Sequence, residues 1–187
     1  MIAAAAAVII GGGVRPLGPA VNPDPNHTHA DFAVWIEDTK VDFARPEFMS
    51  VEGQNPKAKF FHLHDGNGEV MHSHKPGQPI GDFFASLGME MTVTCFRLDP
   101  DNAACNNPDG RTWKMFVNGV EKPFDPRYSF QDLDRILLTY GSNEVQIQQQ
   151  LADLTDESCL YSKTCPERGD PPTENCVADP AVPCMME

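Results

Sequence analysis

The sequence has few basic residues and lacks the usual motifs of redox, nucleotide-binding and hydrolytic proteins. Only 14 Lys and Arg residues stand against 27 Asp and Glu residues, so the formal net charge is −13. Nucleic acids and anionic membrane surfaces need a basic footprint, so this balance argues against both partners. No Cys-x-x-Cys occurs, which excludes a thioredoxin-type motif and a zinc ribbon. Phosphate-binding loops and the Gly-x-Ser-x-Gly nucleophile motif are also missing.

Long apolar runs are also scarce. The run Met-Ile-Ala-Ala-Ala-Ala-Ala-Val-Ile-Ile at residues 1–10 is too short to span a bilayer. It also lacks the basic segment that opens a secretory signal. Two interpretations remain open. The run is the remnant of an export signal or anchor, or it is a mature apolar strand that buries itself in a partner.

The six cysteines fall into three couples that are close in the sequence. They are Cys95 and Cys105, Cys159 and Cys165, and Cys176 and Cys184. An even count in segments rich in Asn, Asp and Pro is typical of disulfides formed in an oxidising compartment. Proximity favours pairing within each couple, although six cysteines allow many other pairings. The cysteines therefore predict an exported protein with disulfide-stapled loops and no free thiol.

Alternating apolar residues and turn signals predict a sheet built from hairpins. Two short helices are expected at residues 79–87 and 144–154, the second capped by Ser142 or Asn143. The expected strands lie at residues 29–36, 41–43, 59–64, 69–74, 91–98, 113–117 and 136–140. This order of elements is typical of a β-grasp-like α+β domain with a mixed sheet and one or two packing helices. We expect an apolar segment and linker at 1–25, the domain at 26–155, and a Cys/Pro-rich tail with little to pack at 156–187.

All six histidines lie in His-x-His pairs: His27 and His29, His62 and His64, and His72 and His74. Random placement at this histidine content predicts roughly 0.2 such pairs, a composition-only estimate. Residues i and i+2 of a strand point to the same face, so both imidazoles of a pair can reach one metal. A lone histidine is more often an ordinary surface or core residue, and a pH-sensing cluster is an alternative for the set. Three pairs with no histidine left over favour metal binding.

Imidazole nitrogen limits the choice of metal. It suits copper, zinc and nickel and does not suit magnesium or calcium. Copper has the highest intrinsic affinity for an open nitrogen site, whereas three imidazoles in a tetrahedron with water favour zinc. We therefore predict a copper or zinc ion as the ligand.

The loop of the central hairpin decides whether its four histidines can share one site. With a three-residue loop at 66–68, His62 faces His72 across the two strands. A two- or four-residue loop turns His72 and His74 to the opposite face, because a shift of one residue flips every side chain.

The residues of this loop favour the first case. Gly68 suits the left-handed position of a bulge that closes a three-residue loop. We therefore predict that His62 and His72 are cross-strand neighbours and share a metal, with His64 or His74 as third ligand. The pair that begins at residue 27 is expected to be the weakest, since it opens a strand beside the linker.

Other candidate ligands have weaker support. Asp65, Asp82 and Glu69 could orient the imidazoles as hydrogen-bond partners, although Asp82 could instead favour the first turn of a helix through the helix dipole. Four methionines offer thioether sulfur atoms, yet methionine more often fills a core. They are Met71, Met89, Met91 and Met115.

Two resemblances extend this interpretation. Residues 80–141 resemble the β-grasp domain of the transcobalamin C-terminal type. More of the chain resembles a group of uncharacterised exported proteins of environmental bacteria and archaea, through His-Thr-His-Ala-Asp-Phe at 27–32, the two His-x-His pairs of the hairpin, and Gly-Asp-Phe-Phe-Ala-Ser-Leu-Gly at 81–88. Some of that group carry a protein-disulfide isomerase label, but this chain lacks the Cys-x-x-Cys motif which that activity requires. The resemblance implies export and a metal site.

These patterns predict an extracytoplasmic protein, whether secreted, at the cell surface or membrane-anchored, that binds copper or zinc through its three pairs. Its role would be metal storage, transfer or cross-linking of subunits. One alternative is a surface or filament subunit that assembles through residues 1–20 with metal-bridged contacts. Another is a histidine-ligated metalloenzyme, which would need an open metal position and a general base.

Overall fold

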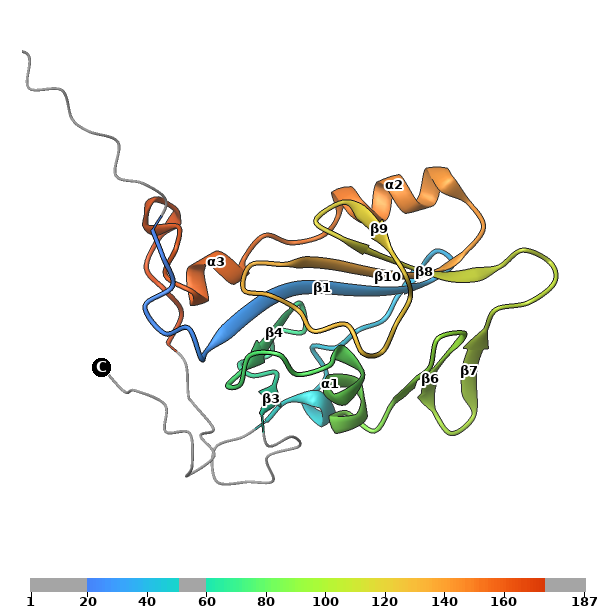
Figure 1. Ribbon diagram of the computed structural model, residues 1–187, viewed down its shortest axis with the longest axis horizontal. Coiled ribbons are helices and arrows are strands. Elements are labelled where there is room, and N and C mark those ends of the chain that lie inside the picture. Colours follow the sequence, from blue (N-terminus) through green and yellow to red (C-terminus); the bar gives the residue numbers. More distant parts are fainter. Residues whose placement is uncertain (1–19, 51–59, 174–187) are drawn as a thin grey trace, which may run out of the picture.

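The main element of the protein is a seven-stranded mixed β-sheet, seen in a computed structural model that describes residues 20–50 and 60–173 (Figure 1). The strand order is β3-β4-β1-β10-β8-β9, and β2 pairs with β1. β1 runs parallel to β10, and the other pairs are antiparallel. The strands are β1 (Thr28–Ile36), β2 (Thr39–Lys40), β3 (Phe61–His62), β4 (Val70–Ser73), β8 (Thr112–Val117), β9 (Val120–Lys122) and β10 (Arg135–Gly141).

The predicted α+β class with a mixed sheet is confirmed, while the β-grasp assignment remains a prediction. A second, three-stranded sheet and a few short helices complete the described part of the chain. The second sheet consists of β5 (Glu90–Met91), β6 (Cys95–Asp99) and β7 (Asn102–Cys105). The helices are α1 (Ile80–Ser86), α2 (Glu144–Ala152), α3 (Ser158–Tyr161) and the 3₁₀ turns η1 (Pro46–Phe48) and η2 (Pro166–Arg168).

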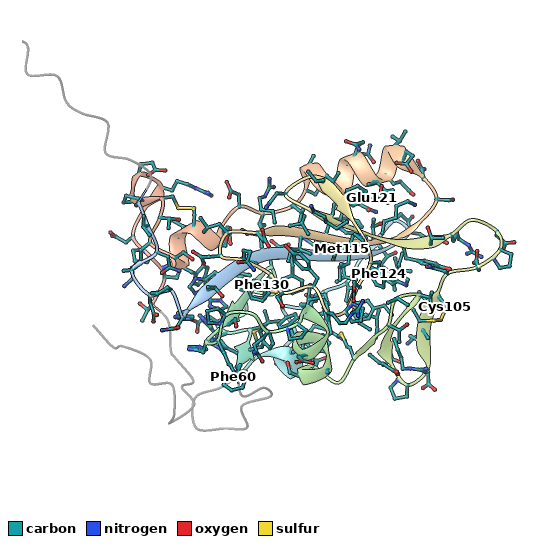
Figure 2. All side chains as sticks on the ribbon, in the orientation of Figure 1. Phe60, Cys105, Met115, Glu121, Phe124 and Phe130 are labelled. Atoms are coloured by element: carbon teal, nitrogen blue, oxygen red, sulfur yellow. A yellow bond between two sulfur atoms is a disulfide. The ribbon has the colours of Figure 1, made fainter. Side chains whose placement is uncertain are left out.

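The two faces of the main sheet are covered by different elements, as the alternation along β1 predicts. Phe32 packs into the main core together with Phe83 of α1. Met115 and Phe130 belong to the same core (Figure 2). Ala33 points the other way and packs into a smaller core with Ile147 of α2. Successive residues of β1 therefore point to opposite faces of the sheet, and its odd-numbered residues lie on the face that α2 covers.

Both predicted helices form, and local signals explain their ends. The Asn143 side chain accepts hydrogen bonds from the backbone N–H groups of Val145 and Gln146, which caps the start of α2. Gly88 has φ +82° just after α1, a conformation in which glycine is favoured. Pro46 is the first residue of the short 3₁₀ helix η1, a position that suits proline because its missing N–H would have no partner there.

The single strand predicted at residues 91–98 is wrong, because the chain reverses within it. Thr92 and Cys95 close the reversal: the Thr92 N–H donates to the Cys95 carbonyl oxygen at 2.8 Å, and the Cys95 N–H donates to Thr92 Oγ1 at 2.9 Å. β5 and β6 are therefore antiparallel partners. Apolar alternation alone did not reveal this turn, since threonine can serve either in a strand or in a side-chain-closed turn.

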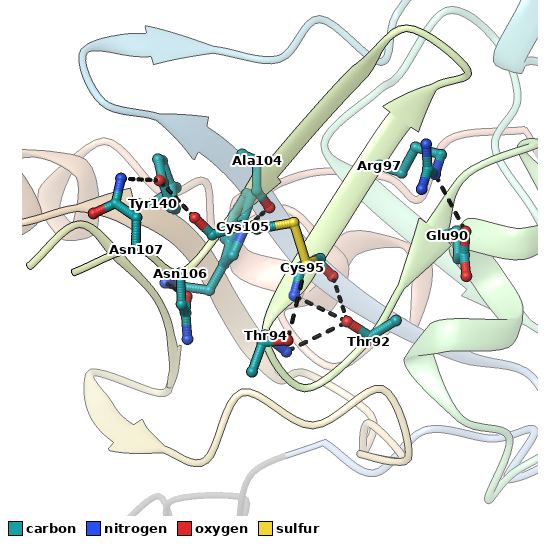
Figure 3. Close-up of a disulfide and its surroundings, with 11 residues drawn as sticks. Glu90, Thr92, Thr94, Cys95, Arg97, Ala104, Cys105, Asn106, Asn107 and Tyr140 are labelled. Carbon is teal, nitrogen blue, oxygen red and sulfur yellow. Dashed lines mark hydrogen bonds and ion pairs between the residues drawn. A yellow bond between two sulfur atoms is a disulfide. The ribbon is translucent and has the colours of Figure 1, made fainter. Parts of the chain in front are cut away.

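The disulfide Cys95–Cys105 joins residues that lie directly opposite each other on β6 and β7 (Figure 3). The Tyr140 hydroxyl donates to the Cys105 carbonyl oxygen at 2.8 Å and accepts from Asn107 Nδ2 at 3.2 Å. Because Tyr140 belongs to β10, these bonds tie the small sheet to the main one.

The second disulfide, Cys159–Cys165, also forms, so two of the three predicted pairings are confirmed. Cys176 and Cys184 lie outside the described residues, as do the apolar residues 1–10. In the ranges that the structure describes, no helix combines the length and apolar character needed to cross a membrane.

Candidate metal centre

Three histidines stand in one row across neighbouring strands of the main sheet. His72 on β4 pairs with His29 on β1 at one side and with His62 on β3 at the other. The prediction that His62 and His72 are cross-strand neighbours is confirmed. Side chains opposed in this way lie within reach of a common ligand.

The register of the hairpin is the predicted one, but its turn is of another type. Asp65 (φ +56°) and Gly66 (φ +73°) occupy the two left-handed positions of a two-residue turn, and the Asn67 N–H donates to the His64 carbonyl oxygen at 3.0 Å. Asn67 Oδ1 then accepts from the N–H groups of residues 69 and 70 at 2.8 and 3.2 Å. This irregular stretch between the turn and β4 restores the register that a three-residue loop would have given.

Gly68 is needed for close packing and not for the turn. The prediction that it adopts a left-handed conformation is wrong, since its φ is not positive. A Cβ atom at this position would lie 2.3 Å from the Ala44 nitrogen and 2.4 Å from the Phe43 carbonyl carbon. Since both atoms belong to the backbone, only glycine lets the hairpin approach the chain this closely.

All six imidazole rings gather at the β3-β4-β1 end of the main sheet. His29, His62, His64, His72 and His74 are buried and His27 is half-buried. The pair at the start of β1, expected to be the weakest, is therefore part of the cluster. Neighbouring ring centroids lie 4.2–5.2 Å apart in the pairs His27–His29, His27–His74, His29–His72, His62–His64, His62–His72, His62–His74 and His64–His72.

Three sets of three histidines have the geometry to hold a metal ion. Within each set, one nitrogen of every ring lies within 4.8 Å of the others. Nitrogens bound to a tetrahedral zinc at about 2.0–2.1 Å lie about 3.4 Å apart, so short ring movements would close each set on an ion. The sets are His27, His29 and His72; His27, His62 and His74; and His62, His64 and His72.

Hydrogen bonds at Nδ1 fix the orientation of two of the rings, His29 and His64. His64 Nδ1 lies 2.8 Å from Asp65 Oδ2, which as a carboxylate accepts, so the proton is on Nδ1 and Nε2 keeps its lone pair. His29 Nδ1 lies 2.7 Å from Ser162 Oγ, and this hydroxyl donates to Asp132 Oδ1 at 2.6 Å. Because the Ser162 hydroxyl uses its own proton for Asp132, its oxygen accepts from His29, so the His29 proton is on Nδ1 as well. Both assignments follow from the acceptor character of the carboxylates.

Burial favours the neutral form of the His62 and His72 rings, which is the form that binds metals. Burial first, and the neighbouring histidines second, hold the pKa of His62 and His72 well below the usual value. His62 Nε2, His64 Nε2 and both ring nitrogens of His72 are buried without a hydrogen-bond partner among the described residues. Leaving such a group unsatisfied costs about 1–3 kcal/mol, which a bound cation would offset.

The lowered pKa values predict that the metal-free protein is sensitive to acid. Below about pH 6.5 the unfolded chain takes up protons on His62 and His72 that the folded state does not. Stability is therefore present above that pH and lost as the pH falls below it. At pH 5.5 we expect a loss of about 1 kcal/mol for each of the two rings, measured by urea unfolding of metal-free protein at pH 7.5 and 5.5. Equal stability at both values would contradict the burial of neutral imidazoles.

Helix α3 covers the cluster. The Tyr161 ring stands edge-on to His72, with centroids 4.8 Å apart and planes at 89°, and lies 5.6 Å from the His29 ring. Tyr161 and Ser162 are buried, so the prediction that the tail has little to pack is wrong for its first ten residues. Nothing in the sequence around residue 161 signalled this contact.

Asp31 holds the covering segment in place. Its fully buried carboxylate accepts hydrogen bonds from Thr155 Oγ1 at 2.7 Å, the Glu157 N–H at 2.7 Å and the Ser158 N–H at 3.0 Å. Sequence reasoning missed this residue, although it lies two positions after His29 and therefore on the same face of β1.

Most of the weaker candidates lie away from the imidazoles. Among the three acidic candidates, only Asp65 bonds to a histidine. Glu69 forms an ion pair with Lys40, and Asp82 is exposed in the first turn of α1. The four methionines belong to the main core, as the more common role of methionine predicts: Met71, Met89, Met91 and Met115.

The candidate ligands are imidazole nitrogens. Two of the rings are held by hydrogen bonds, His64 to the Asp65 carboxylate and His29 to the Ser162 hydroxyl. Such a set fits copper, zinc or nickel, and its burial would exclude most water from a bound ion.

Comparison with known proteins finds no matching family model, no matching curated protein and no matching solved structure, so the histidine centre itself is the guide to function.

Proposed function

We propose that this protein is an extracytoplasmic carrier or store for a transition metal, copper or zinc, held by the histidine cluster. One observation carries the proposal: six histidines in or next to three neighbouring strands form three overlapping metal-sized sets. Tyr161 of α3 lies against His72, which belongs to two of these sets. Without a cation the site would keep several buried nitrogens unsatisfied, which is unfavourable.

Burial of the cluster supports holding a metal rather than turning over a substrate. A catalytic metal needs an open coordination position that a substrate can reach. A cavity of about 440 Å³ lies against residues 40–44 and 66–69, and none of the histidines lines it.

The two disulfides favour an oxidising compartment, where such bonds form and persist.

Metal binding is expected to stabilise the fold. An ion present at 100 times its dissociation constant adds about 2.7 kcal/mol, which corresponds to a rise in Tm of roughly 5–10 °C for a chain of this size. Thermal unfolding of untagged protein, purified without a nickel column and stripped with a chelator, measures this rise on addition of Cu(II) or Zn(II). Elemental analysis before stripping gives the metal acquired in the cell.

Variants make the test specific. The double substitution His62→Asn and His72→Asn breaks all three sets, so the metal-induced rise in Tm should disappear. His74→Asn is the matched control, since it leaves two sets intact and should keep most of the rise. A wild-type protein that contains no metal, and whose Tm does not respond to either ion, would refute the proposed function.

A further inference from the structure

His72 differs from the other central histidines in that both of its ring nitrogens are unsatisfied. Nδ1 and Nε2 are buried and have no hydrogen-bond partner among residues 20–50 and 60–173. In His64, by contrast, Nδ1 bonds to Asp65, so one nitrogen remains for a ligand. A neutral imidazole has one N–H and one lone pair, and burying both unpaired is doubly unfavourable. A cation on each nitrogen would satisfy the whole ring.

His72 also lies where two metal sets meet. It belongs to the set with His27 and His29 and to the set with His62 and His64, and these two sets have no other member in common. The strand pairing explains this position, because β4 lies between β1 and β3 and places His72 between His29 and His62. A ring nitrogen binds one metal at a time, so filling both sets together requires both nitrogens of His72.

We propose that two metal ions occupy these two sets at once and that the His72 imidazolate bridges them, an inference that rests on the proposed function. One ion is held by His27, His29 and His72, and the other by His62, His64 and His72. The second ion replaces the remaining N–H proton of His72, and this proton passes to solvent without any change of oxidation state. Two metal–nitrogen bonds of about 2.0–2.1 Å on opposite sides of the ring place the ions about 6 Å apart.

His74 is left outside both sets in this arrangement. Its ring stacks on His27 at 4.2 Å and on His62 at 4.8 Å, so it lies beside one ligand of each ion. It can replace His72 only by forming the third set, with His27 and His62, which holds a single ion. The two binding modes therefore differ in stoichiometry, two ions with the bridge and one without it.

Titration of the metal-free full chain with Cu(II) tests the bridge in the wild-type protein. An imidazolate couples two Cu(II) spins antiferromagnetically, so we expect the electron paramagnetic resonance signal to grow with the first equivalent and lose most of its intensity as the second binds. Saturation at one equivalent, or two equivalents with the full uncoupled signal, would overturn the bridge and leave the proposed function standing. A failure to bind any copper or zinc would overturn both.

A matched pair of variants identifies the bridging residue. His72→Asn is expected to lower the copper stoichiometry from two to one and to restore a full uncoupled signal from the remaining ion. His74→Asn should keep two equivalents and the coupled, weakened signal. Two coupled ions in the His72→Asn variant would assign the bridge to another group and overturn the inference.

Discussion

Replacing Asp31 by alanine is expected to lower the free energy of unfolding by about 3 kcal/mol or more and to loosen the cover of the histidine cluster. The carboxylate is fully buried and accepts three hydrogen bonds from residues 155–158. Bonds to a charged group contribute about 1.5–3 kcal/mol each, and the truncation leaves buried donors without an acceptor. Urea unfolding of the metal-free variant measures the loss.

A second measurement separates the cover from general stability. If the contacts of Asp31 hold α3 over the rings, Asp31→Ala should also release a bound metal faster into an excess of chelator. Asp38→Ala is the control, because Asp38 is exposed in the turn between β1 and β2. Exposed substitutions of this kind change stability by about 0.5 kcal/mol or less. An Asp31→Ala protein that matches the control in both measurements would show that this carboxylate does not anchor the cover.

Replacing Gly68 by alanine is expected to destabilise the protein by about 3 kcal/mol, at the upper end of overpacking effects. The new Cβ would lie 2.3 Å from the Ala44 nitrogen and 2.4 Å from the Phe43 carbonyl carbon, and neither backbone atom can move aside as a side chain could. The hairpin must then shift away from residues 43–44. Because His64 and His72 lie on this hairpin, metal affinity should fall together with stability.

Gly66→Asn provides the comparison within the same turn. Gly66 has φ +73°, and a Cβ atom at this position would meet no other atom within 4 Å. Asparagine also tolerates the left-handed conformation. This variant should lose about 0.5 kcal/mol or less and keep wild-type metal affinity. Equal losses for Gly66→Asn and Gly68→Ala in urea unfolding would mean that the close approach to Ala44 does not limit the hairpin.

The local part of the centre could be predicted from the residues because strands repeat every two positions. Each His-x-His pair is placed on one face by this rule. The predicted register of the 62–72 hairpin is correct although the predicted turn is not, because the irregular stretch held by Asn67 restores it. The same reasoning failed where two local structures share one pattern. Glycine serves both a left-handed turn and a close contact, so the turn type at Gly68 was wrong. Threonine closes a turn as readily as it extends a strand, so the reversal after Met91 was missed.

Residues close together in the chain suffice to predict the two faces of β1, two of the disulfides and the pairing of His62 with His72. The tertiary structure is needed to bring His29 to these rings, because β1 and β4 pair across more than forty residues. It alone placed Ser162 and Tyr161 over the centre, 133 positions along the chain from His29 in the case of Ser162. Periodicity gives the direction of a side chain but not the partner of its strand, since pairing between distant segments depends on the packing of the whole core.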